Sequence, residues 1–433
     1  MSHGLEGLQD FTDGYKKTEV GVIPVEWDIK KISKIGKVVR GGSPRPAGSP
    51  KFFGGNYIPW LTVAALTNIP EFSVYVNQTF GFLTEEGAKQ SRKLENGTLI
   101  IANSGATLGV AKILLVKCCA NDGIAALIDL SKDVEKLFLY YFLNTKTKEF
   151  REVIATGNGQ PNLNTTLIGL TKIPLPPFPE QKAIALSLSD TDALIAACES
   201  AITKKRNIKQ GAMQQLLTGK MRLPGFSGEW EVKKLGELGA TNKPPIKAGP
   251  FGSSLKKSYY VKEGYKIYGQ EQVIAKDFSI GNYYIDKQRF ESLKSCAIQP
   301  KDILISLVGT FGKVVVVPEA IEPGIINPRL IRLSLNWDKV CPYFVKDLLI
   351  SSTTQKLLEQ TSHGGTMGII NAKTLNLLPI SSPPLPEQKA IAQILSDTDA
   401  EIAALEKKRD KYKAIKQGMM QELLTGKTRL NAD

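Results

Sequence analysis

The sequence has few of the residues and motifs that enzymes use for catalysis. Histidine occurs only twice in 433 residues, at His3 and His363, so we expect neither a histidine general base nor a zinc site. The stretch from Gly309 to Lys313 is too short for a phosphate loop, and Val314 stands where a magnesium-binding hydroxyl is needed. No glycine fingerprint for a dinucleotide or S-adenosylmethionine follows a predicted strand. We therefore expect no catalytic residue and no metal site in this chain.

Cysteine motifs and long apolar runs are also missing. The five cysteines are odd in number and show no C-x-x-C spacing, which is typical of buried, reduced thiols in a cytoplasmic protein. No apolar run reaches the roughly 18 residues of a membrane span, and no charged-then-apolar leader opens the chain. We expect neither a transmembrane segment nor a secretory signal.

The chain does have an excess of positive charge and enough apolar residues to form a core. Its formal net charge is +14, and 42% of its residues are hydrophobic. This balance suits binding to nucleic acid or to an anionic membrane surface, although basic enzymes share it. At this length, two domains of roughly 150 residues plus helices are a natural partition.

The chain is organised by an internal repeat. Pro179–Leu223 returns at Pro386–Leu430 without a gap, at an offset of 207 residues and with 31 of 45 positions identical. A repeat of this kind predicts two copies of one unit, each a globular part followed by a helix. The predicted partition is 1–178 (globular, with an arm at 1–22), 179–223 (helix), 224–385 (globular) and 386–433 (helix).

The repeated segment is predicted to be a long helix with a narrow apolar seam. Its apolar residues recur in alternating steps of four and three, the spacing of a helix that packs against a partner helix. The seam residues are Ile184, Leu188, Ile195, Cys198 and Ile202 in the first copy, and Ile391, Leu395, Ile402, Leu405 and Tyr412 in the second. The glycine of a shared Leu-Leu-Thr-Gly-Lys string ends each copy. A break near the Ser-Asp-Thr-Asp string at 189–192, or its copy, is the open alternative, because such residues cap helices and Gly211 and Gly418 weaken a helix interior.

Chain geometry favours an antiparallel pairing of the two helices. A helix of some 40 residues is roughly 60 Å long. A domain of about 160 residues is only about 40 Å across, so the second helix is expected to begin near the end of the first and to run back along it. We expect one globular domain at each end, related by a pseudo-two-fold axis. We also expect the lysines and arginines at 204–206 and 407–409 to face outward.

Both globular segments contain basic loops rich in glycine, proline and serine. Small residues allow a close approach of two backbones, and interleaved basic and polar side chains offer donors to phosphates and base edges. A solvated turn explains either loop alone, but two such loops at equivalent positions favour nucleic acid. The candidate DNA-contacting residues are Arg40, Gly42, Ser43, Arg45, Lys51, Asn56, Ser104, Asn158 and Gln160 in the first segment, and Lys247, Gly252, Ser253, Ser254, Lys256, Lys257, Gln270, His363 and Thr366 in the second.

The later part of each globular segment has the same predicted order of elements. A pair of strands brackets a glycine turn, a helix follows, and a second glycine-rich loop precedes a proline-rich exit. The predicted strands are 98–101, 111–116, 302–306 and 314–317, and the predicted helices are 134–150 and 342–359. Trp27 and Trp230, near the openings of the two segments, are expected to pack inside their own domains.

With these motifs in place, the chain resembles the specificity subunit of Type I restriction–modification systems. The likeness rests on the order of two domains and two PEQK…LLTGK helices, and on the strings GGSPRP…FFGGNYIPW, GPFGSSLKKS, QPNLN and LPPFPEQKAI. It covers nearly the whole chain. The resemblance implies an α+β fold in which two mixed α/β target-recognition domains are separated by two long antiparallel coiled-coil helices.

The resemblance also implies a non-catalytic, cytoplasmic subunit of a larger complex. Each domain would read one half of a bipartite double-stranded DNA site, while the helices set the spacer and dock two methyltransferase subunits. S-adenosylmethionine, ATP and magnesium would belong to these and to restriction subunits, and this chain would need no cofactor. A structural adaptor, a stand-alone DNA-binding module without a modification partner, and an enzyme with unfamiliar motifs remain as alternatives.

Overall fold

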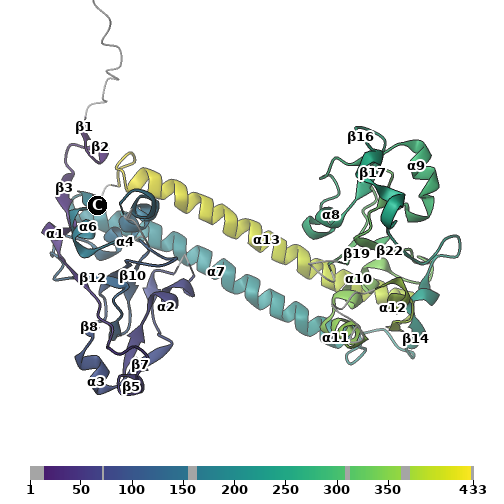
Figure 1. The fold of residues 1–433 in the computed structure, drawn as a ribbon, viewed down its shortest axis with the longest axis horizontal. Coiled ribbons are helices and arrows are strands. Elements are labelled where there is room, and N and C mark those ends of the chain that lie inside the picture. The colour runs from purple at the N-terminus through teal and green to yellow at the C-terminus, as the bar shows by residue number, and fades with distance from the viewer. Residues whose placement is uncertain (1–13, 71–72, 155–162, 308–312, 362–370, 431–433) are drawn as a thin grey trace, which may run out of the picture. The chain divides into compact units, whose positions relative to one another are not determined.

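The computed structural model divides into two compact units, each of which contains part of both long helices. Unit 1 comprises Met1–Ala201 and Leu405–Asp433, and unit 2 comprises Ile202–Ala404. The structure describes residues 14–70, 73–154, 163–307, 313–361 and 371–430 (Figure 1). No helix among these residues is long and apolar enough to cross a bilayer.

The two long helices are continuous. They are α7 (Phe178–Leu216) and α13 (Leu385–Leu423), teal and yellow in Figure 1. Each has 39 residues and is therefore about 58 Å long. Both run through the Ser-Asp-Thr-Asp strings and through Gly211 and Gly418, so the alternative of a broken helix is wrong. A Cβ added at either glycine would meet nothing within 4 Å, so no neighbouring element that the structure describes packs against these positions.

The helices are antiparallel in each unit, as ion pairs between them show. In unit 1, Lys416 Nζ lies 2.6 Å from Asp192 Oδ1, and Lys413 Nζ lies 3.3 Å from Glu199 Oε1. In unit 2, Lys209 Nζ lies 2.6 Å from Asp399 Oδ1. In unit 1, a step forward along α7 from Asp192 to Glu199 is a step back along α13 from Lys416 to Lys413, which defines the antiparallel direction. In unit 2 the same holds, because Lys205 pairs with Glu401 and Lys209 with the earlier Asp399.

Unit 1 is built of short strands with a few helices. Its strands are β1 (Tyr15–Thr18), β2 (Gly21–Pro24), β3 (Asp28–Lys31), β4 (Lys37–Arg40), β5 (Phe53–Leu61), β6 (Tyr75–Val76), β7 (Gly81–Leu83), β8 (Arg92–Leu94), β9 (Leu99–Ala102), β10 (Ala111–Leu114), β11 (Cys118–Ala120), β12 (Ile124–Ile128) and β13 (Lys172–Leu175). Its helices besides the long pair are α1 (Ile32–Ile35), α2 (Val63–Thr67), α3 (Glu85–Lys89), α4 (Lys136–Thr145), α5 (Thr147–Glu149), a π-helix (Phe150–Ile154) and α6 (Thr165–Leu170). The arm predicted at 1–22 therefore ends in a β1–β2 hairpin that continues to residue 24.

Unit 2 repeats much of this plan. Its strands are β14 (Glu231–Lys234), β15 (Ile246–Ala248), β16 (Tyr260–Val261), β17 (Tyr265–Tyr268), β18 (Tyr284–Ile285), β19 (Ile303–Ser306), β20 (Val314–Val316), β21 (Gly324–Ile326), β22 (Leu330–Leu333) and β23 (Pro379–Ser382). Its helices are α8 (Gln270–Ala275), α9 (Lys287–Ser292), α10 (Pro342–Ile350), α11 (Ser352–Thr361), α12 (Ala372–Asn376) and 3-10 turns at Leu235–Leu238, Gly252–Leu255, Lys257–Tyr259 and Lys294–Cys296.

Equivalent strands pair in the same way in the two units. Sheet order β4-β12-β9-β10-β6 in unit 1 corresponds to β15-β22-β19-β20 in unit 2. The short exit strand returns to the opening of each globular part, as β13 against β3 and β23 against β14. Each unit also has a second sheet, β7-β5-β11-β8 in unit 1 and β16-β18-β17-β21 in unit 2. Each of these sheets contains one parallel pair, β5–β11 or β17–β21. The duplication predicted from the helices therefore extends to the sheets.

Each core takes in the beginning of one long helix and the end of the other. In unit 1, Ile184 and Leu188 of α7 and Leu423 of α13 pack with Trp27 and Phe138. In unit 2, Ile391 and Leu395 of α13 pack with Leu216, the last residue of α7, with Leu217 directly after it, and with Phe344. Burial of these apolar side chains is the main stabilising contribution to each unit.

The glutamate of each repeated PEQK string forms an ion pair with an arginine that lies two residues after an LLTGK string. In unit 1, Glu180 of α7 is 4% exposed, accepts hydrogen bonds from Arg429 at 2.7 and 2.9 Å, and accepts one from Trp27 Nε1 at 3.0 Å. In unit 2, Glu387 is fully buried and accepts from Arg222 at 2.6 and 2.7 Å. Bidentate arginine contacts of this kind are strong and specific in geometry. In each unit they join the start of one long helix to the segment that follows the other.

The glutamines of the PEQK strings fasten each long helix to its own domain. Gln181 accepts from Glu135 N at 2.8 Å and donates to Pro176 O at 2.9 Å. Gln388 accepts from Cys341 N at 2.9 Å and donates to Pro383 O at 2.8 Å. These amides satisfy backbone groups that would otherwise be buried without partners.

Candidate nucleic-acid interface

In unit 1 the basic loop leaves strand β4 and is held against a turn at Asn121–Gly123. Gly41 N donates to Ile124 O at 2.8 Å, and Gly42 N donates to Ala120 O at 2.9 Å. A side chain at position 41 would overlap the carbonyl oxygen of Asn121, so this close approach requires glycine. The loop is therefore fixed at its base.

Asp122 joins the polar side chains of this loop. Its carboxylate accepts from Ser43 Oγ at 2.7 Å and lies 3.8 Å from the guanidinium of Arg45 and 4.0 Å from that of Arg40. Its backbone oxygen accepts from Arg40 Nε at 2.7 Å and from Asn103 Nδ2 at 3.2 Å. The side chain of Arg40 is 54% exposed and that of Arg45 is 74% exposed, so both keep donor positions toward solvent. Oriented guanidinium groups of this kind suit phosphate oxygens and guanine edges.

The other unit 1 candidates lie at different distances from this cluster. Ser104 is half-buried beside the same turn, since a side chain at Gly123 would meet its hydroxyl at 2.8 Å. Lys51 is exposed at the start of the β5 region, and Asn56 is exposed within β5. Neither is among the groups that pair with the Asp122 carboxylate. The structure thus gathers Arg40, Ser43, Arg45 and Ser104, and leaves Gly42 as part of the anchored backbone.

Unit 2 holds its basic loop on the same backbone frame. Gly249 N donates to Leu330 O at 3.0 Å, and a side chain at position 249 would overlap the carbonyl oxygen of Asn327. Asn327 N in turn donates to Tyr268 O at 2.8 Å, as Asn121 N donates to Leu61 O at 3.0 Å in unit 1. Lys247 lies half-buried on β15, directly before this anchored turn.

The tip of the unit 2 loop presents exposed lysines. Gly252, Ser253 and Ser254 are exposed in a 3-10 turn, and Lys256 and Lys257 are exposed just after it. Leu255 between them is buried in the second core cluster of unit 2, which holds the turn down. Phe251 is 66% exposed beside the lysines. Gln270 is half-buried at the first position of α8.

Four residues of these frames were not predicted from the sequence. They are Asn121, Asp122, Asn327 and Arg329, which follow the strands that the glycine loops pack against. The Asn-Asp-Gly string at 121–123 is a turn signal between two apolar runs and could have indicated the first pair. Four predicted candidates, Asn158, Gln160, His363 and Thr366, lie outside the described residues.

The predicted helix seam occupies the interior of the helix pair for most of its length. Buried seam residues are Ile184, Leu188, Ile195, Cys198, Ile202, Ile391, Leu395 and Ile402, whereas Leu405 and Tyr412 are half-buried. The prediction that Lys205 and Arg409 face outward is wrong. Lys205 pairs with Glu401 in unit 2, and Arg409 lies 3.6 Å from Glu199 in unit 1, because each is placed beside an acid of the other helix.

The described residues contain no group of three or more histidine, cysteine or acidic side chains that could hold a metal ion. All five cysteines are buried and unpaired. Burial raises the pKa of the Cys118 thiol to about 12, so this thiol stays protonated near neutral pH and behaves as a small apolar side chain.

Comparison with known proteins points to one family. The model of the Type I restriction modification DNA specificity domain matches twice, at residues 24–208 and 227–416. The MjaVIII specificity subunit of a type I restriction enzyme from Methanocaldococcus jannaschii is 26% identical over 94% of this chain and 94% of its own length. The MjaIX specificity subunit of the same organism is 30% identical over 52% of this chain and 54% of its own.

A solved structure shares the fold. The S subunit of a Type-I restriction-modification system from M. genitalium superposes with a TM-score of 0.56 at 15% identity, covering 92% of this chain and 96% of the other. The two family matches each contain one set of the equivalent strands and most of one long helix. This chain therefore belongs to the Type I restriction–modification DNA specificity family, with two copies of the family domain.

Proposed function

We propose that this chain is the DNA-binding specificity subunit of a Type I restriction–modification complex, and that each unit reads one half of a bipartite site. The observation that carries this proposal is the repeated loop frame. Gly41 packs on Asn121 and Gly249 packs on Asn327 in the same way, yet the side chains around the two frames differ. A common frame with different donors suits two half-sites of different sequence.

The charged groups of the loops divide into two roles. The exposed lysines at 256 and 257 are positioned as phosphate contacts, which contribute affinity without sequence preference. Arg40 donates to the backbone oxygen of Asp122 at 2.7 Å, and Arg45 lies 3.8 Å from its carboxylate. These contacts favour the defined orientation that base reading requires. The net charge of +14 adds a long-range attraction to the duplex.

In this proposal the chain has no catalytic role of its own. Two methyltransferase subunits that use S-adenosylmethionine would dock on it and methylate adenines at the site, and restriction subunits that use ATP and magnesium would add cleavage. The long helices would set the unread gap between the half-sites.

The test is selection from a random duplex pool with the chain bound to its methyltransferase subunits. The expected result is one enriched sequence made of two short half-sites around a gap of fixed length. Enrichment of a single uninterrupted site, or of no sequence, would contradict the proposal. An adaptor that never binds DNA would enrich no sequence.

A further inference from the structure

The two loop frames share one register. In each, the anchoring glycine, Gly41 or Gly249, donates to a strand residue and packs on the asparagine three positions before that residue. The strands that lead into the loops, β4 and β15, pair with the equivalent partners β12 and β22. Positions at the same separation from each anchor can therefore be compared directly.

At the compared positions, the polar cluster around Asp122 in unit 1 is replaced by apolar residues in unit 2. The replacements are Arg40 by Ala248, Ser43 by Phe251 and Asp122 by Pro328. The side chains of alanine, phenylalanine and proline carry no hydrogen-bond donor or acceptor. These three positions of unit 2 therefore cannot orient a guanidinium group as they do in unit 1.

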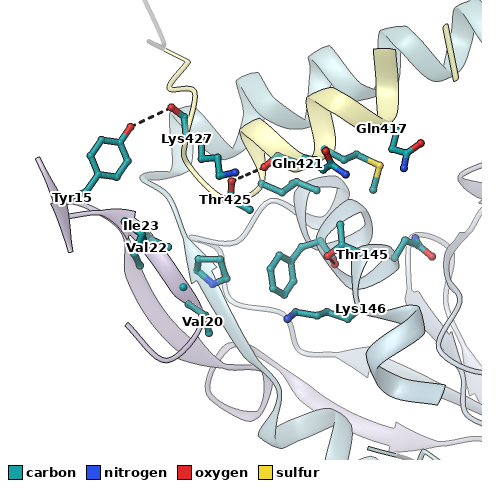
Figure 2. Close-up of a pocket in the computed structure, with 16 residues that line it drawn as sticks. Tyr15, Val20, Val22, Ile23, Thr145, Lys146, Gln417, Gln421, Thr425 and Lys427 are labelled. Carbon is teal, nitrogen blue, oxygen red and sulfur yellow. Dashed lines mark hydrogen bonds between the residues drawn. The ribbon is translucent and has the colours of Figure 1, made fainter. Parts of the chain in front are cut away.

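The units also differ away from the loops, at the end of α13. In unit 1 the β1–β2 hairpin is tied to the segment after this helix by a hydrogen bond from Tyr15 Oη to Lys427 O at 3.3 Å (Figure 2). A groove of about 1000 Å³ lies there, and none of the residues that line it belongs to the loop frame. The difference between the two loops is therefore separate from the difference at the helix end.

Phe251 is the replacement that reaches into solvent. Its exposed fraction is 66%, and it caps the 3-10 turn Gly252–Leu255, in which Ser254 N donates to Phe251 O at 3.3 Å. Leu255, at the other end of the turn, is buried in the core. Among the residues that the structure describes, no core cluster and no aromatic contact includes Phe251. The turn is therefore held in place while the ring stays uncovered.

A single exposed phenylalanine needs no explanation in itself, but the place of this one gives it a role. It lies at the position that is part of the polar cluster in unit 1, and Lys256 and Lys257 are exposed just beyond it. These lysines suit phosphate contacts, which would hold the loop on a duplex. A ring at this position would then face the bases.

The chemistry of a phenyl ring limits what it recognises on a base pair. The base edges in the major groove present hydrogen-bond donors and acceptors, and the one apolar group among them is the C5-methyl group of thymine. Phenylalanine is one of the side chains that contact this methyl group.

We propose that Phe251 is a specificity-determining residue of unit 2, and that its ring contacts the C5-methyl group of a thymine in the half-site of that unit. This inference rests on the proposed function, since it takes the loop to read DNA. Unit 1 then reads its half-site with oriented arginines, whereas unit 2 reads one A·T pair through an apolar contact.

The first experiment repeats the selection from a random duplex pool with Phe251→Ala, again bound to the methyltransferase subunits. We expect the wild type to select an A·T pair at one position of one half-site. The variant should lose the preference at that position and keep the rest of the sequence. A selected sequence that does not change in the variant would overturn the inference.

The second experiment removes only the methyl group. Duplexes of the selected site carry thymine or deoxyuridine at that pair, because uracil keeps every hydrogen-bonding group of thymine. Fluorescence anisotropy should show the wild type binding the uracil duplex about fourfold more weakly, as expected for one buried methyl group. Phe251→Ala should bind both duplexes alike, and Phe251→Leu should keep part of the preference. The matched control is Phe80→Ala in unit 1, which removes a similarly exposed phenylalanine (71%) and should keep the wild-type ratio.

The ratio of the two affinities separates this role from others. A wild type that binds the two duplexes alike, or a Phe251→Ala variant that still prefers thymine, would overturn the inference. Equal weakening of both duplexes by Phe251→Ala would also overturn it, since a ring inserted between base pairs does not depend on the methyl group. A wild type that selects no bipartite sequence would instead contradict the proposed function, and the inference with it.

Discussion

Asp122 brings a negative charge into a loop that is otherwise basic. A carboxylate beside a DNA backbone is repulsive, so its presence needs a compensating role. That role is orientation, because one carboxylate pairs with Ser43 and lies within 4.0 Å of two guanidinium groups. Exposed pairs of this kind contribute little stability, about 0–1 kcal/mol each. The contribution of Asp122 is therefore expected to appear in specificity more than in folding.

The variant Asp122→Ala tests this role. Loss of the carboxylate removes the ion pair of Arg45 and the weaker one of Arg40, whose Nε keeps the Asp122 backbone oxygen as its partner. We therefore expect binding to the selected site to weaken about tenfold. Binding to random duplex should stay constant or strengthen slightly, since a negative charge is lost. The control is Glu152→Ala, which removes a more exposed acid (62% against 41% for Asp122) outside the loop. Equal changes for both kinds of DNA, measured by fluorescence anisotropy, would assign Asp122 a purely electrostatic role.

Lys256 and Lys257 are predicted to behave in the opposite way. Changing either to alanine removes one exposed charge, so affinity for all duplexes should fall alike. The slope of log affinity against log salt should decrease by about 1 for each lysine that contacts a phosphate. Titrations at several salt concentrations provide the measurement. An unchanged slope would show that this loop does not contact the DNA backbone.

Asp347, on α10 of unit 2, is a buried acid. Its side chain is 1% exposed, and its Oδ1 has no hydrogen bond although Lys346 Nζ lies 2.9 Å away. Burial raises the pKa of this carboxyl, and nearby Asp399 adds to the effect, while Lys346 and Lys209 oppose it. At neutral pH the ionised form is therefore disfavoured by the fold.

The variant Asp347→Asn should stabilise unit 2 at pH 7, on the order of 1 kcal/mol. A carboxyl whose pKa is raised on folding costs stability as pH rises through the interval from its ordinary value of 3.8 to its higher folded value. The gain should therefore disappear as pH falls below 3.8, where the wild-type group is protonated in both states. Urea unfolding across pH measures this, with the exposed Asp338→Asn as control. A gain that does not change with pH would contradict the explanation.

At the scale of elements, local sequence signals gave a wrong prediction where contacts with distant residues determine the secondary structure. The Ser-Asp-Thr-Asp strings contain good cap residues, yet both helices continue through them. Asp192 accepts from Tyr141 Oη at 2.8 Å and pairs with Lys416, and Thr191 Oγ1 donates to Ser187 O at 3.0 Å. These side chains are engaged and cannot cap a new helix. The sequence alone does not show that Tyr141 and Lys416 lie beside Asp192. A break in the helix could therefore not be excluded from the sequence.

The predicted helices at 134–150 and 342–359 show the reverse error, because each is interrupted. A turn at Lys146 separates α4 from α5, and extended backbone at Ser351 separates α10 from α11. Ser351 Oγ accepts from Thr354 N at 3.3 Å and so caps the second helix. The strands around the glycine turns were predicted to within two residues, since their buried apolar runs are a strong signal.

The two buried glutamate–arginine pairs allow a matched stability prediction. Arg429→Ala leaves Glu180 with the hydrogen bond from Trp27, whereas Arg222→Ala leaves Glu387 without an equivalent, because the Trp230 indole NH has no partner. Removing one partner of a fully buried ion pair costs about 3–5 kcal/mol, and the cost is smaller here because the side chains of Arg429 and Arg222 are 32% and 28% exposed. We expect both variants to lose stability, and the loss from Arg222→Ala to be larger. Urea unfolding followed by tryptophan fluorescence measures it, and equal losses would show that Trp27 contributes nothing.

At the scale of the whole chain, the duplication could be recognised in the sequence because 31 of the 45 aligned positions of the two repeated segments are identical. The sheets repeat the same topology with little sequence identity, so their equivalence emerged only from strand pairing. The loop frames at Gly41 and Gly249 depend on contacts with turns some 80 residues further along the chain. Such distant contacts explain why the loops were predicted but Asp122 and Asn327 were not.

The proposed spacer role of the helices leads to a prediction about DNA. Deleting Cys198–Lys204 from α7 and Leu405–Lys411 from α13 removes one heptad from each helix in its least repeated part, and so keeps the seam in register. Seven residues correspond to about 10 Å of helix, or about 3 base pairs of B-DNA. If the helices set the gap, selection from a random duplex pool should return the same two half-sites with a shorter gap. Deletion from α7 alone misaligns the pair and should abolish selection. An unaltered gap in the double deletion would show that something other than helix length spaces the half-sites.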